Sequence, residues 1–401
     1  MNQPILQLAS NCLECKKPKC RPGCPIDTPI PEMIHLFLNG NIQEAGKILF
    51  ENNHLSVICS LVCPHEKHCE GHCILNKKGA PVSVGAIEHY ISSNYLMRTE
   101  FEKAKPNGKS VAIIGSGPAG MGLAFLLAKK GYDITIYDKN DKVGGVLRYG
   151  IPSFRLDKSI LDTLIEKLKN LGVKIRPNVT IGKYLTIENL FRDGFDAVFI
   201  GTGVWAPKLL NIKGESLGNV HFAIDYLKNP DVHELGNKVV VLGAGNVAMD
   251  VARTAVRKGV KEVRIMYRRG EEDMPASKHE IQCTKLDGVF FDFYRTPYEI
   301  TTDGIHFIQN NESGFETADS VLIAISQNPK DVIVSNNKGI AVDKQGLVLT
   351  DDHGHTTQPG VFASGDVVTG ARTVVEAVAL SKKVASAIES YLLEKEFKVK
   401  S

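Results

Sequence analysis

The 401-residue sequence predicts an α/β fold: a small helical N-terminal module, then two units of alternating strands and helices, the second inserted in the first. Three observations predict it. Eight of the nine cysteines lie within the first 73 residues. From residue 110 onward, short apolar runs typical of buried strands alternate with amphipathic runs typical of helices. Two of the apolar runs end in a glycine-rich turn.

The composition excludes several classes of protein. Apolar residues make up 43% of the chain and charged residues 23%, which is ordinary for globular proteins and unlike disordered or fibrous ones. The 48 Lys and Arg residues against 45 Asp and Glu leave a formal net charge of +3. Proteins that track phosphate backbones carry a larger basic excess, so we expect no nucleic-acid partner.

One uncharged stretch, residues 111–128, is long enough to raise the question of a membrane helix. Four glycines and Pro118 interrupt it, which favours a buried strand, a turn and a helix, so we expect no membrane association. The first eleven residues lack a basic group ahead of an apolar run. This predicts a cytoplasmic protein without a secretory signal, in a compartment where thiols stay reduced.

The N-terminal module is expected to span residues 1–105. Helical periodicity covers residues 33–50 and 84–95. Residues 103–109 contain Pro106, Asn107 and Gly108, which is the composition of a linker. We therefore place a domain boundary after residue 105.

The remaining chain is read as two domains. Strands are predicted at 110–114, 134–137 and 197–200, with helices at 121–130 and 158–171. A second series starts with strands at 239–242, 263–267 and 321–325, and the chain closes with a short strand after Gly360 and a helix over 373–393. The pattern assigns residues 106–230 and 330–401 to one domain and residues 231–329 to a domain inserted in it.

The cysteines form two runs with ligand-like spacing. The first resembles the bacterial ferredoxin run that ends in Cys-Pro, whose last cysteine binds the other cluster. Two [4Fe-4S] clusters that share ligands across the runs are therefore predicted, and the lysines among the cysteines would offset cluster charge. The runs are Cys12-x2-Cys15-x4-Cys20-x3-Cys24-Pro25 and Cys59-x3-Cys63-Pro64-x4-Cys69-x3-Cys73.

Other interpretations of the cysteines stay open. Structural zinc favours paired Cys-x2-4-Cys units, of which the chain has a single Cys-x2-Cys. Disulfides are disfavoured in a reducing compartment, and buried free thiols do not explain such a concentration of cysteine.

The first glycine-rich turn matches the Rossmann dinucleotide fingerprint. It follows a predicted strand, and Asp138 ends the next strand, 23 residues beyond Gly115. The glycines allow a tight turn and close approach of a pyrophosphate to the helix N-terminus, while the acid accepts from a ribose hydroxyl. The turn reads Gly115-Ser116-Gly117-Pro118-Ala119-Gly120.

The second turn repeats the pattern without the acid. Aligned from the first glycines, with one extra residue allowed, Tyr267 takes the place of Asp138. Arg268 and Arg269 follow, and guanidinium groups there suit a 2′-phosphate, favouring NADPH with NADH possible. A solvated pair of surface arginines is the alternative. The turn reads Gly243-Ala244-Gly245-Asn246-Val247-Ala248.

Two dinucleotide sites in one chain suggest a flavin and a nicotinamide. The first turn is the better FAD candidate, because Gly144 and Gly145 follow it and Gly365-Asp366 precedes a long helix. There an acid could meet the flavin ribityl chain and pyrophosphate. A simple helix-entry turn is the alternative for Asp366.

With these motifs assembled, nearly the whole chain resembles the glutamate synthase small-subunit-like oxidoreductases. That family includes the N-terminal part of dihydropyrimidine dehydrogenase, its bacterial flavin subunit, and the large subunit of NADH-dependent ferredoxin:NADP oxidoreductase. The stretches that match are residues 12–25, 62–64, 81–88, 144–147, 149–152, 267–269 and 365–366, with Cys69 and Cys73. The turn from Gly365 to Thr373 looks more like the dehydrogenase and ferredoxin-oxidoreductase branches than glutamate synthase itself.

The resemblance implies a ligand set for each cluster. Cys12, Cys15, Cys20 and Cys73 would bind one. Cys24, Cys63 and Cys69 would bind the other, with Glu88 as its fourth ligand and Cys59 as a bystander. Carboxylates are uncommon iron-sulfur ligands, so the choice of Glu88 over Cys59 comes from the resemblance and not from spacing.

Two departures limit the transfer. Ser326 stands where the family has a glycine, in a stretch that lines the contact between nicotinamide and flavin. The chain also shows no glutaminase domain and no pyrimidine-binding barrel, so we expect a second catalytic subunit or a ferredoxin-like acceptor as partner.

The expected function is that of an electron-transfer subunit, an NAD(P)H-dependent FAD and iron-sulfur oxidoreductase. Nicotinamide gives two electrons as hydride and a cluster carries one, so a flavin must connect them. The direction of flow stays open, and no side chain is assigned as catalytic. The alternatives are a stand-alone reductase of a small acceptor, disulfide or sulfur compound, disfavoured because the second nucleotide domain has Cys283 alone, and a zinc-bound interaction domain.

Overall fold

The computed structural model describes residues 3–329, 333, 337 and 339–400, with side chains described as far as residue 395. The chain forms two compact units. The first comprises Met1–Leu147, Ser153–Val204 and Pro329–Ser401, and the second comprises Arg148–Pro152 and Trp205–Asn328. The second unit is inserted in the first, and the predicted fold class is confirmed. The predicted domain start at residue 330 lies outside the described residues.

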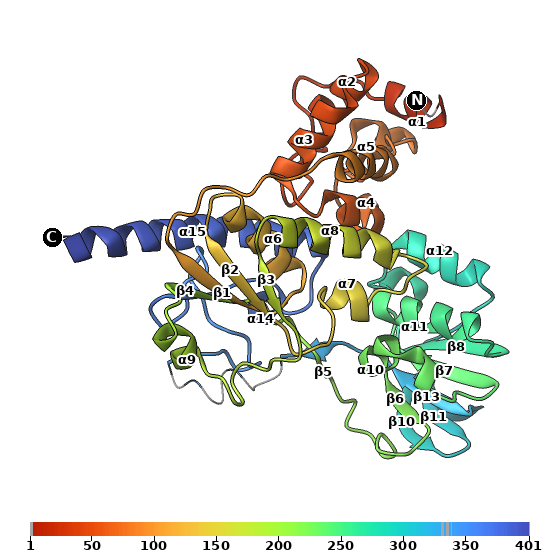
Figure 1. Ribbon diagram of the computed structural model, residues 1–401. Helices are drawn as coiled ribbons and strands as arrows, with labels where there is room; N and C mark the ends of the chain where they lie inside the picture. Colours follow the sequence, from red (N-terminus) through yellow and green to blue (C-terminus); the bar gives the residue numbers. More distant parts are fainter. Residues whose placement is uncertain (1–2, 330–332, 334–336, 338, 401) are drawn as a thin grey trace. The chain divides into compact units, whose positions relative to one another are not determined.

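A helical module opens the first unit (Figure 1). Its core includes Met33, Ile34, Phe37 and Leu49, all fully buried. The helical periodicity over 33–50 corresponds to two helices, because Gly40 adopts a φ of 80° and separates them. The elements are α1 (Gln3–Ser10), α2 (Ile30–Leu38), α3 (Ile42–Asn52), α4 (Ser56–Val62) and α5 (Val84–Arg98), with 3-10 turns η1 (His65–Lys67) and η2 (Ile74–Lys78).

A five-stranded parallel sheet forms the centre of the rest of this unit. Its strand order is β15-β4-β1-β2-β3, so the order reverses at β1. In such sheets, ligands bind outside the carboxyl ends of the strands at this switch point. The strands are β1 (Ser110–Ile114), β2 (Asp133–Tyr137), β3 (Lys174–Arg176), β4 (Ala197–Ile200) and β15 (Val361–Ala363).

Helices cover this sheet. The helix that follows β1 is buried over almost its whole length and packs along the C-terminal helix. The helical module joins the same packing, since α4 contacts α8 and α15. The helices are α6 (Pro118–Ala128), α7 (Val146–Tyr149), α8 (Lys158–Asn170), α9 (Ile187–Arg192), α14 (Asp366–Thr369) and α15 (Val374–Lys400).

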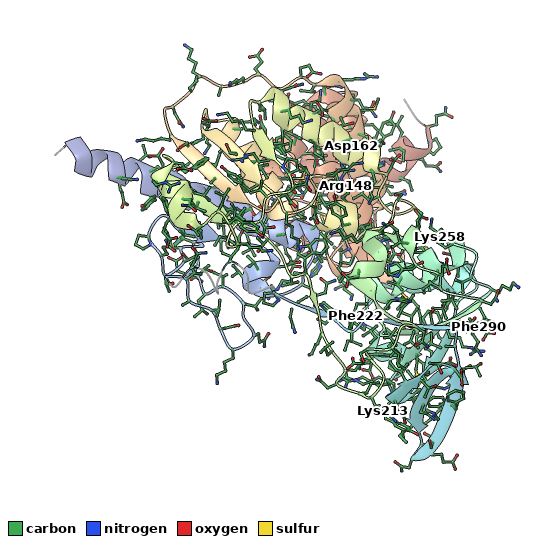
Figure 2. All side chains as sticks on the ribbon, turned by 60° about the horizontal axis from the view of Figure 1, so that its bottom comes forward. Arg148, Asp162, Lys213, Phe222, Lys258 and Phe290 are labelled. Atoms are coloured by element: carbon green, nitrogen blue, oxygen red, sulfur yellow. The ribbon has the colours of Figure 1, made fainter. Side chains whose placement is uncertain are left out.

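The second unit repeats the parallel sheet. Its order is β6-β13-β7-β8-β9, with β7 in the position of β1. Phe222 on β6 and Phe290 on β9 mark its two edges (Figure 2). The strands are β6 (Val220–Phe222), β7 (Lys238–Leu242), β8 (Glu262–Tyr267), β9 (Phe290–Phe293) and β13 (Ser320–Ile323), and the helices are α10 (Ala223–Lys228), α11 (Asn246–Arg257) and α12 (Lys278–Leu286).

An antiparallel sheet that the sequence did not predict is added to the second unit. Its strands are β10 (Thr296–Thr301), β11 (Gly304–Gln309) and β12 (Glu312–Thr317), and a two-stranded pair joins β5 (Ala206–Pro207) to β14 (Gln327–Asn328). The 3-10 turns η3 (Pro230–Val232) and η4 (Glu271–Asp273) complete the unit.

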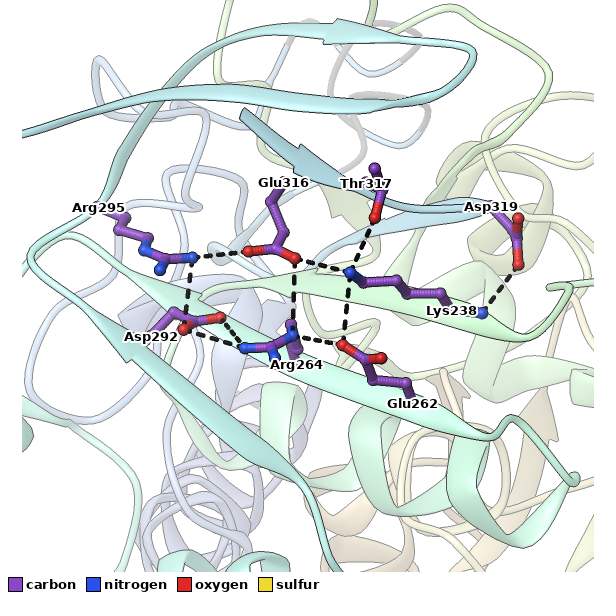
Figure 3. A network of polar contacts seen from close by, with 8 residues as sticks. All are labelled: Lys238, Glu262, Arg264, Asp292, Arg295, Glu316, Thr317 and Asp319. Carbon is purple, nitrogen blue, oxygen red and sulfur yellow. Dashed lines mark hydrogen bonds and ion pairs between the residues drawn. The ribbon is translucent and has the colours of Figure 1, made fainter. Parts of the chain in front are cut away.

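A charge network ties β12 to the parallel sheet (Figure 3). Glu316 on β12 lies 2.8 Å from Lys238 on β7 and 2.9 Å from Arg295, while Arg264 on β8 lies 3.2 Å from Asp292 on β9. Burial alone would raise the pKa of Glu316, but its bonds to Lys238 and Arg295 outweigh burial and lower it. The network fixes the added sheet against β7 and β8.

No helix in the described part of the chain is both long enough and apolar enough to cross a membrane.

Candidate cofactor sites

The first glycine turn is built by close packing at the end of β1. Gly115 has a φ of 100°, and a Cβ there would lie 2.5 Å from the carbonyl oxygen of Gly201. A Cβ on Gly120 would lie 2.0 Å from the carbonyl oxygen of Gly115. Neither position accepts a larger residue without moving backbone. The sequence therefore uses these two glycines to fold the turn itself.

Gly117 differs, because a Cβ there would have no atom within 4 Å apart from those of its two chain neighbours. It is the N-cap residue of α6, and no side chain caps this helix end. The first amide groups of the helix therefore have no side-chain acceptor. An open cradle at a helix N-terminus suits an anionic pyrophosphate, which would lie where a side chain is missing. This is the observation by which the turn fits a dinucleotide.

Asp138 follows β2 and is buried, with both carboxylate oxygens engaged. One accepts from the backbone amide of Ser116 at 2.9 Å and from its hydroxyl, and the other accepts from the amide of Asn140 at 2.8 Å. The Ser116 hydroxyl in turn accepts from the Gly144 amide at 3.0 Å. A carboxylate has further lone pairs, so a ribose hydroxyl can still be accommodated. Sequence reasoning missed Ser116 and Asn140; a hydroxyl between two motif glycines was the available signal.

Distant segments converge on this turn. A Cβ on Gly145 would lie 2.8 Å from the Cα of Gly117, and one on Gly365 would lie 3.0 Å from the Cβ of Ala119. Asp366 accepts from the Arg372 amide at 3.2 Å, and burial raises its pKa to about 6. Thr373 donates its hydroxyl to Glu376 at 2.5 Å at the start of α15. The structure thus brings the predicted FAD segments together around one helix N-terminus.

The second turn repeats the first in detail. Gly243 has a φ of 131°, and a Cβ there would lie 2.3 Å from the carbonyl oxygen of Ala324, the residue after β13. Gly245 is the N-cap of α11 without a side-chain cap, and its nearest neighbour, Pro275, would be 3.9 Å from a Cβ. Asn246 accepts from the Ser277 amide at 2.9 Å. Val247 and Ala248 pack into the core of this unit.

The end of β8 carries the expected arginines. The Gly115 amide donates to Tyr137 and the Gly243 amide donates to Met266, so Tyr267 stands where Asp138 stands in the first sheet. Arg268 and Arg269 follow and are both exposed. Within the described residues, neither guanidinium group has an ion pair or hydrogen bond. They are available to an anionic group.

Ser326 keeps the backbone of a glycine. Its φ is 128°, a region that side-chain-bearing residues rarely adopt. Its carbonyl accepts from the Lys208 amide at 3.2 Å. The local geometry is therefore preserved at the cost of backbone strain.

One group of cysteines surrounds an apolar pocket in the helical module. Burial raises the pKa of Cys20 to about 11, and the charges of Cys73 and Cys12 add to it. Burial likewise raises the pKa of Cys12, and Cys15 and Cys73 contribute. All four thiols line one cavity of about 90 Å³. The structure therefore brings together the first predicted ligand set, from both cysteine runs.

A second group gathers around Glu88 on α5. Burial raises the pKa of Cys69, to which the charges of Glu88 and Cys24 add. A hydrogen bond to the free thiol of Cys59 and burial raise the pKa of Cys63, and the charge of Glu88 contributes there too. Both Glu88 and Cys59 therefore lie near Cys63.

Glu88 is 7% exposed, and its carboxylate has no hydrogen bond or ion pair within the described residues. Burial raises its pKa to about 8. An unpartnered buried carboxylate is costly unless a cation compensates it. Buried thiols that must ionise to bind metal have the same requirement. The residues therefore fit metal centres.

No three His, Cys, Asp or Glu side chains in the described part of the chain lie close enough to hold one metal ion. Tetrahedral zinc requires four donors around one atom, whereas the ligands of a cubane cluster each bind a different iron.

The helical module and the first sheet share side-chain contacts. His54 lies between Phe50 of α3 and Phe125 of α6, and Lys382 of α15 donates to the side chain of Asn52 at 2.9 Å. His68, next to Cys69, is close enough to Glu376 of α15 to feel its charge. The second cysteine group thus lies in the part of the helical module that is near α15, a helix of the domain that contains the first glycine turn.

Two family matches cover most of the chain. Residues 109–380 match the pyridine nucleotide-disulphide oxidoreductase family, and residues 1–100 match the family described as dihydropyrimidine dehydrogenase domain II, 4Fe-4S cluster. These matches define an NAD(P)H-dependent oxidoreductase of the FAD and iron-sulfur class.

Curated relatives span nearly the same length. The glutamate synthase (NADPH) small chain of Escherichia coli is 32% identical over 428 residues, covering 96% of this chain and 90% of the relative. The NAD-dependent dihydropyrimidine dehydrogenase subunit PreT of Escherichia coli is 33% identical over 394 residues, covering 96% and 93%. The chain therefore belongs to the glutamate synthase small-subunit-like family of oxidoreductases.

Solved structures share the fold. Thioredoxin reductase of T. acidophilum superposes with a TM-score of 0.58 at 23% identity, covering 70% of this chain and 98% of that one. A 2-naphthoyl-CoA reductase superposes with a TM-score of 0.61 at 21% identity, covering 91% of this chain and 49% of that one. At this level of identity, the likeness concerns the fold alone.

Proposed function

We propose that the chain is an electron-transfer subunit that oxidises NADPH at FAD and delivers single electrons to a partner subunit, with two [4Fe-4S] clusters as carriers. A flavin supplies hydride exchange with nicotinamide and one-electron exchange with iron-sulfur centres, which is why such a chain would hold all three groups. The observation that carries the proposal is the unit that contains both the open first glycine turn and the two cysteine groups.

The FAD site would be formed by the first turn and the segments that converge on it. Gly117 leaves room for the pyrophosphate, and the N-terminus of α6 stabilises its charge. Asp138 would accept from the ribose, held in place by Ser116 and Asn140. The remaining residues of the site are Gly115, Pro118, Ala119, Gly120, Gly144, Gly145, Gly365, Asp366 and Thr373.

The nicotinamide dinucleotide would bind at the second turn, where Gly245 leaves the same open cradle. Arg268 and Arg269 support NADPH as the preferred form, because a 2′-phosphate would give their unpaired guanidinium groups a partner in a fork geometry. Gly243, Asn246, Val247 and Ala248 complete the proposed site.

The two clusters would take the two cysteine groups. Cys12, Cys15, Cys20 and Cys73 are proposed to hold one, and Cys24, Cys63 and Cys69 with Glu88 the other. The unpartnered carboxylate of Glu88 supports its choice over Cys59. A thiol tolerates burial as a neutral group, whereas a carboxylate without donors does not.

A second subunit is proposed as the electron acceptor or donor. The relatives include proteins named as a small chain of glutamate synthase, a subunit of dihydropyrimidine dehydrogenase and a subunit of formate dehydrogenase. Within the described residues, the second unit offers Cys283 as its single cysteine, so a dithiol that would reduce disulfides beside the flavin is not present there.

Anaerobic titration with NADPH tests the proposal. The purified chain should show flavin bleaching followed by loss of the broad cluster absorption, and it should reduce ferricyanide. A chain that reduces neither its flavin nor its clusters, or that reduces a small disulfide faster than ferricyanide, would contradict it.

A further inference from the structure

Two large apolar side chains near the first cysteine group face solvent. Leu13 is 61% exposed and Ile74 is 53% exposed. Each directly follows a cysteine of this group, Cys12 and Cys73. Both side chains also line the cavity that these cysteines surround. Single exposed apolar residues need no explanation, but two at the mouth of one pocket form a surface.

Basic side chains lie beside the two apolar ones. Lys17 and Lys19 line the same cavity, and Lys77 and Lys78 end the 3-10 turn that starts at Ile74. All four lysines are exposed, and none of their side-chain amines has an ion pair or hydrogen bond within the described residues. Glu14, which follows Leu13, contacts the ring Nδ1 of His35 at 2.8 Å. We call Leu13, Ile74, Lys17 and Lys19 the Leu13–Ile74 patch.

In a simpler interpretation, the lysines serve only to offset the negative charge of a cluster. Solvent and salt screen exposed charges strongly, so exposed lysines would have a limited effect on a centre held by the half-buried cysteines of this group. That alternative also leaves the exposure of Leu13 and Ile74 unexplained. An apolar centre with a charged rim is, by contrast, the usual composition of a protein interface.

We propose that the Leu13–Ile74 patch is the docking surface for an acidic protein whose own one-electron centre lies at its contact face. This inference rests on the proposed function and specifies where the partner binds. The lysines would steer an acidic surface into place, and the two apolar side chains would exclude water between the partner and the first cysteine group. Small apolar contacts of this kind suit short-lived electron-transfer complexes.

Binding of an acidic two-[4Fe-4S] ferredoxin to the holoprotein tests the proposal, measured by titration calorimetry at low and high salt. The wild-type protein should bind with an affinity that falls as salt rises. Lys17→Glu with Lys19→Glu should raise the Kd about tenfold at low salt, and Leu13→Ser with Ile74→Ser about fivefold without changing the salt dependence. Lys344→Glu, an exposed lysine of the first sheet's domain, is the matched control and should leave the Kd unchanged.

Iron content and NADPH-dependent flavin bleaching are measured on every variant. If the double variant Lys17→Glu with Lys19→Glu loses iron, the double variant Lys77→Glu with Lys78→Glu is tested in its place. It should weaken ferredoxin binding in the same way. Absence of ferredoxin binding to wild type, or a Kd unaffected by charge reversal, would overturn the docking surface while NADPH bleaching still upheld the proposed function. Loss of bleaching in wild type would instead reject the function.

Discussion

The imidazole of His54 stacks on the ring of Phe125, with ring centroids 5.3 Å apart and planes inclined by 8°. His54 lies between α3 and α4 in the helical module, and Phe125 lies in α6, the helix that begins at the first glycine turn. The Nε2 atom of His54 is buried without a hydrogen-bond partner. A neutral aromatic contact therefore joins the cysteine module to the proposed flavin domain.

This contact predicts a pH dependence of stability. Burial, with Lys129 and Lys382 nearby, lowers the pKa of His54 from 6.5 to about 3. The unfolded chain then binds more protons than the folded one between these values, so stability is complete above pH 6.5 and falls as pH drops toward 3. Between pH 7.5 and 5.5 the group should remove about 1.4 kcal/mol. Chemical denaturation at both pH values should show this loss in the wild-type protein and its absence in His54→Phe.

A methyl group on Gly117 should disrupt FAD binding without disrupting the fold. Gly117→Ala places a Cβ where no atom lies within 4 Å apart from those of the two chain neighbours, in the space proposed for the pyrophosphate. We expect the FAD dissociation constant to rise at least about tenfold and the unfolding free energy to change by less than about 1 kcal/mol. Flavin retention on gel filtration measures the first. Gly218→Ala, equally unobstructed, should keep its FAD.

Substitution of Glu88 and of Cys59 tests which of the two is the fourth ligand of the second cluster. Glu88→Ala should lose about half of its iron, because one cluster loses a ligand. Cys59→Ser should keep its full iron content, since its thiol is proposed to be a bystander. Iron assay and electron paramagnetic resonance of the reduced protein measure both. The reverse result would assign Cys59 as ligand.

The arginines after β8 should set cofactor preference. Arg268→Ala with Arg269→Ala should raise the KM for NADPH about tenfold to a hundredfold and leave the KM for NADH nearly unchanged, because NADH lacks the 2′-phosphate. Steady-state reduction of ferricyanide gives both constants. Lys261→Ala, an exposed cation just before β8, should change neither. Equal losses with both cofactors would place the arginines outside the phosphate site.

Ser326→Gly should stabilise the second unit. Relief of a φ of 128° is worth about 1–3 kcal/mol, against a loss of up to about 1 kcal/mol from the greater freedom of glycine in the unfolded chain. We expect a net gain of about 1 kcal/mol in the free energy of unfolding, seen in denaturant titration. Ser326→Val should lose stability, because branching at Cβ worsens the same strain.

The sequence predicted the elements in which local pattern and tertiary packing agree. Strand β4 starts and ends as expected, and the strands beside the glycine turns begin within one residue of the prediction. The added sheet was missed because β10 and β12 are largely polar or half-exposed and Pro297 interrupts β10. The Asn310-Asn311 turn, with both φ values positive, was a hairpin signal that could have found it.

Site residues that are close together in the sequence could be predicted from it, whereas residues that meet only through folding could not. The glycine turns have a sequence fingerprint, so Gly117 and Gly245 could be named directly. The meeting of Cys73 with Cys12 and Cys20 depends on how the helices of the module pack, and spacing alone cannot give it. Ser116 acts through contacts to Asp138 and Gly144 that arise only when three loops meet.

The most direct test of the central claim is the metal and flavin content of the anaerobically purified chain, followed by NADPH titration. We expect about eight iron atoms and about one FAD per chain, with cluster signals appearing in electron paramagnetic resonance as NADPH is added. Zinc in place of iron, or clusters that stay oxidised after the flavin has been fully reduced, would contradict the account.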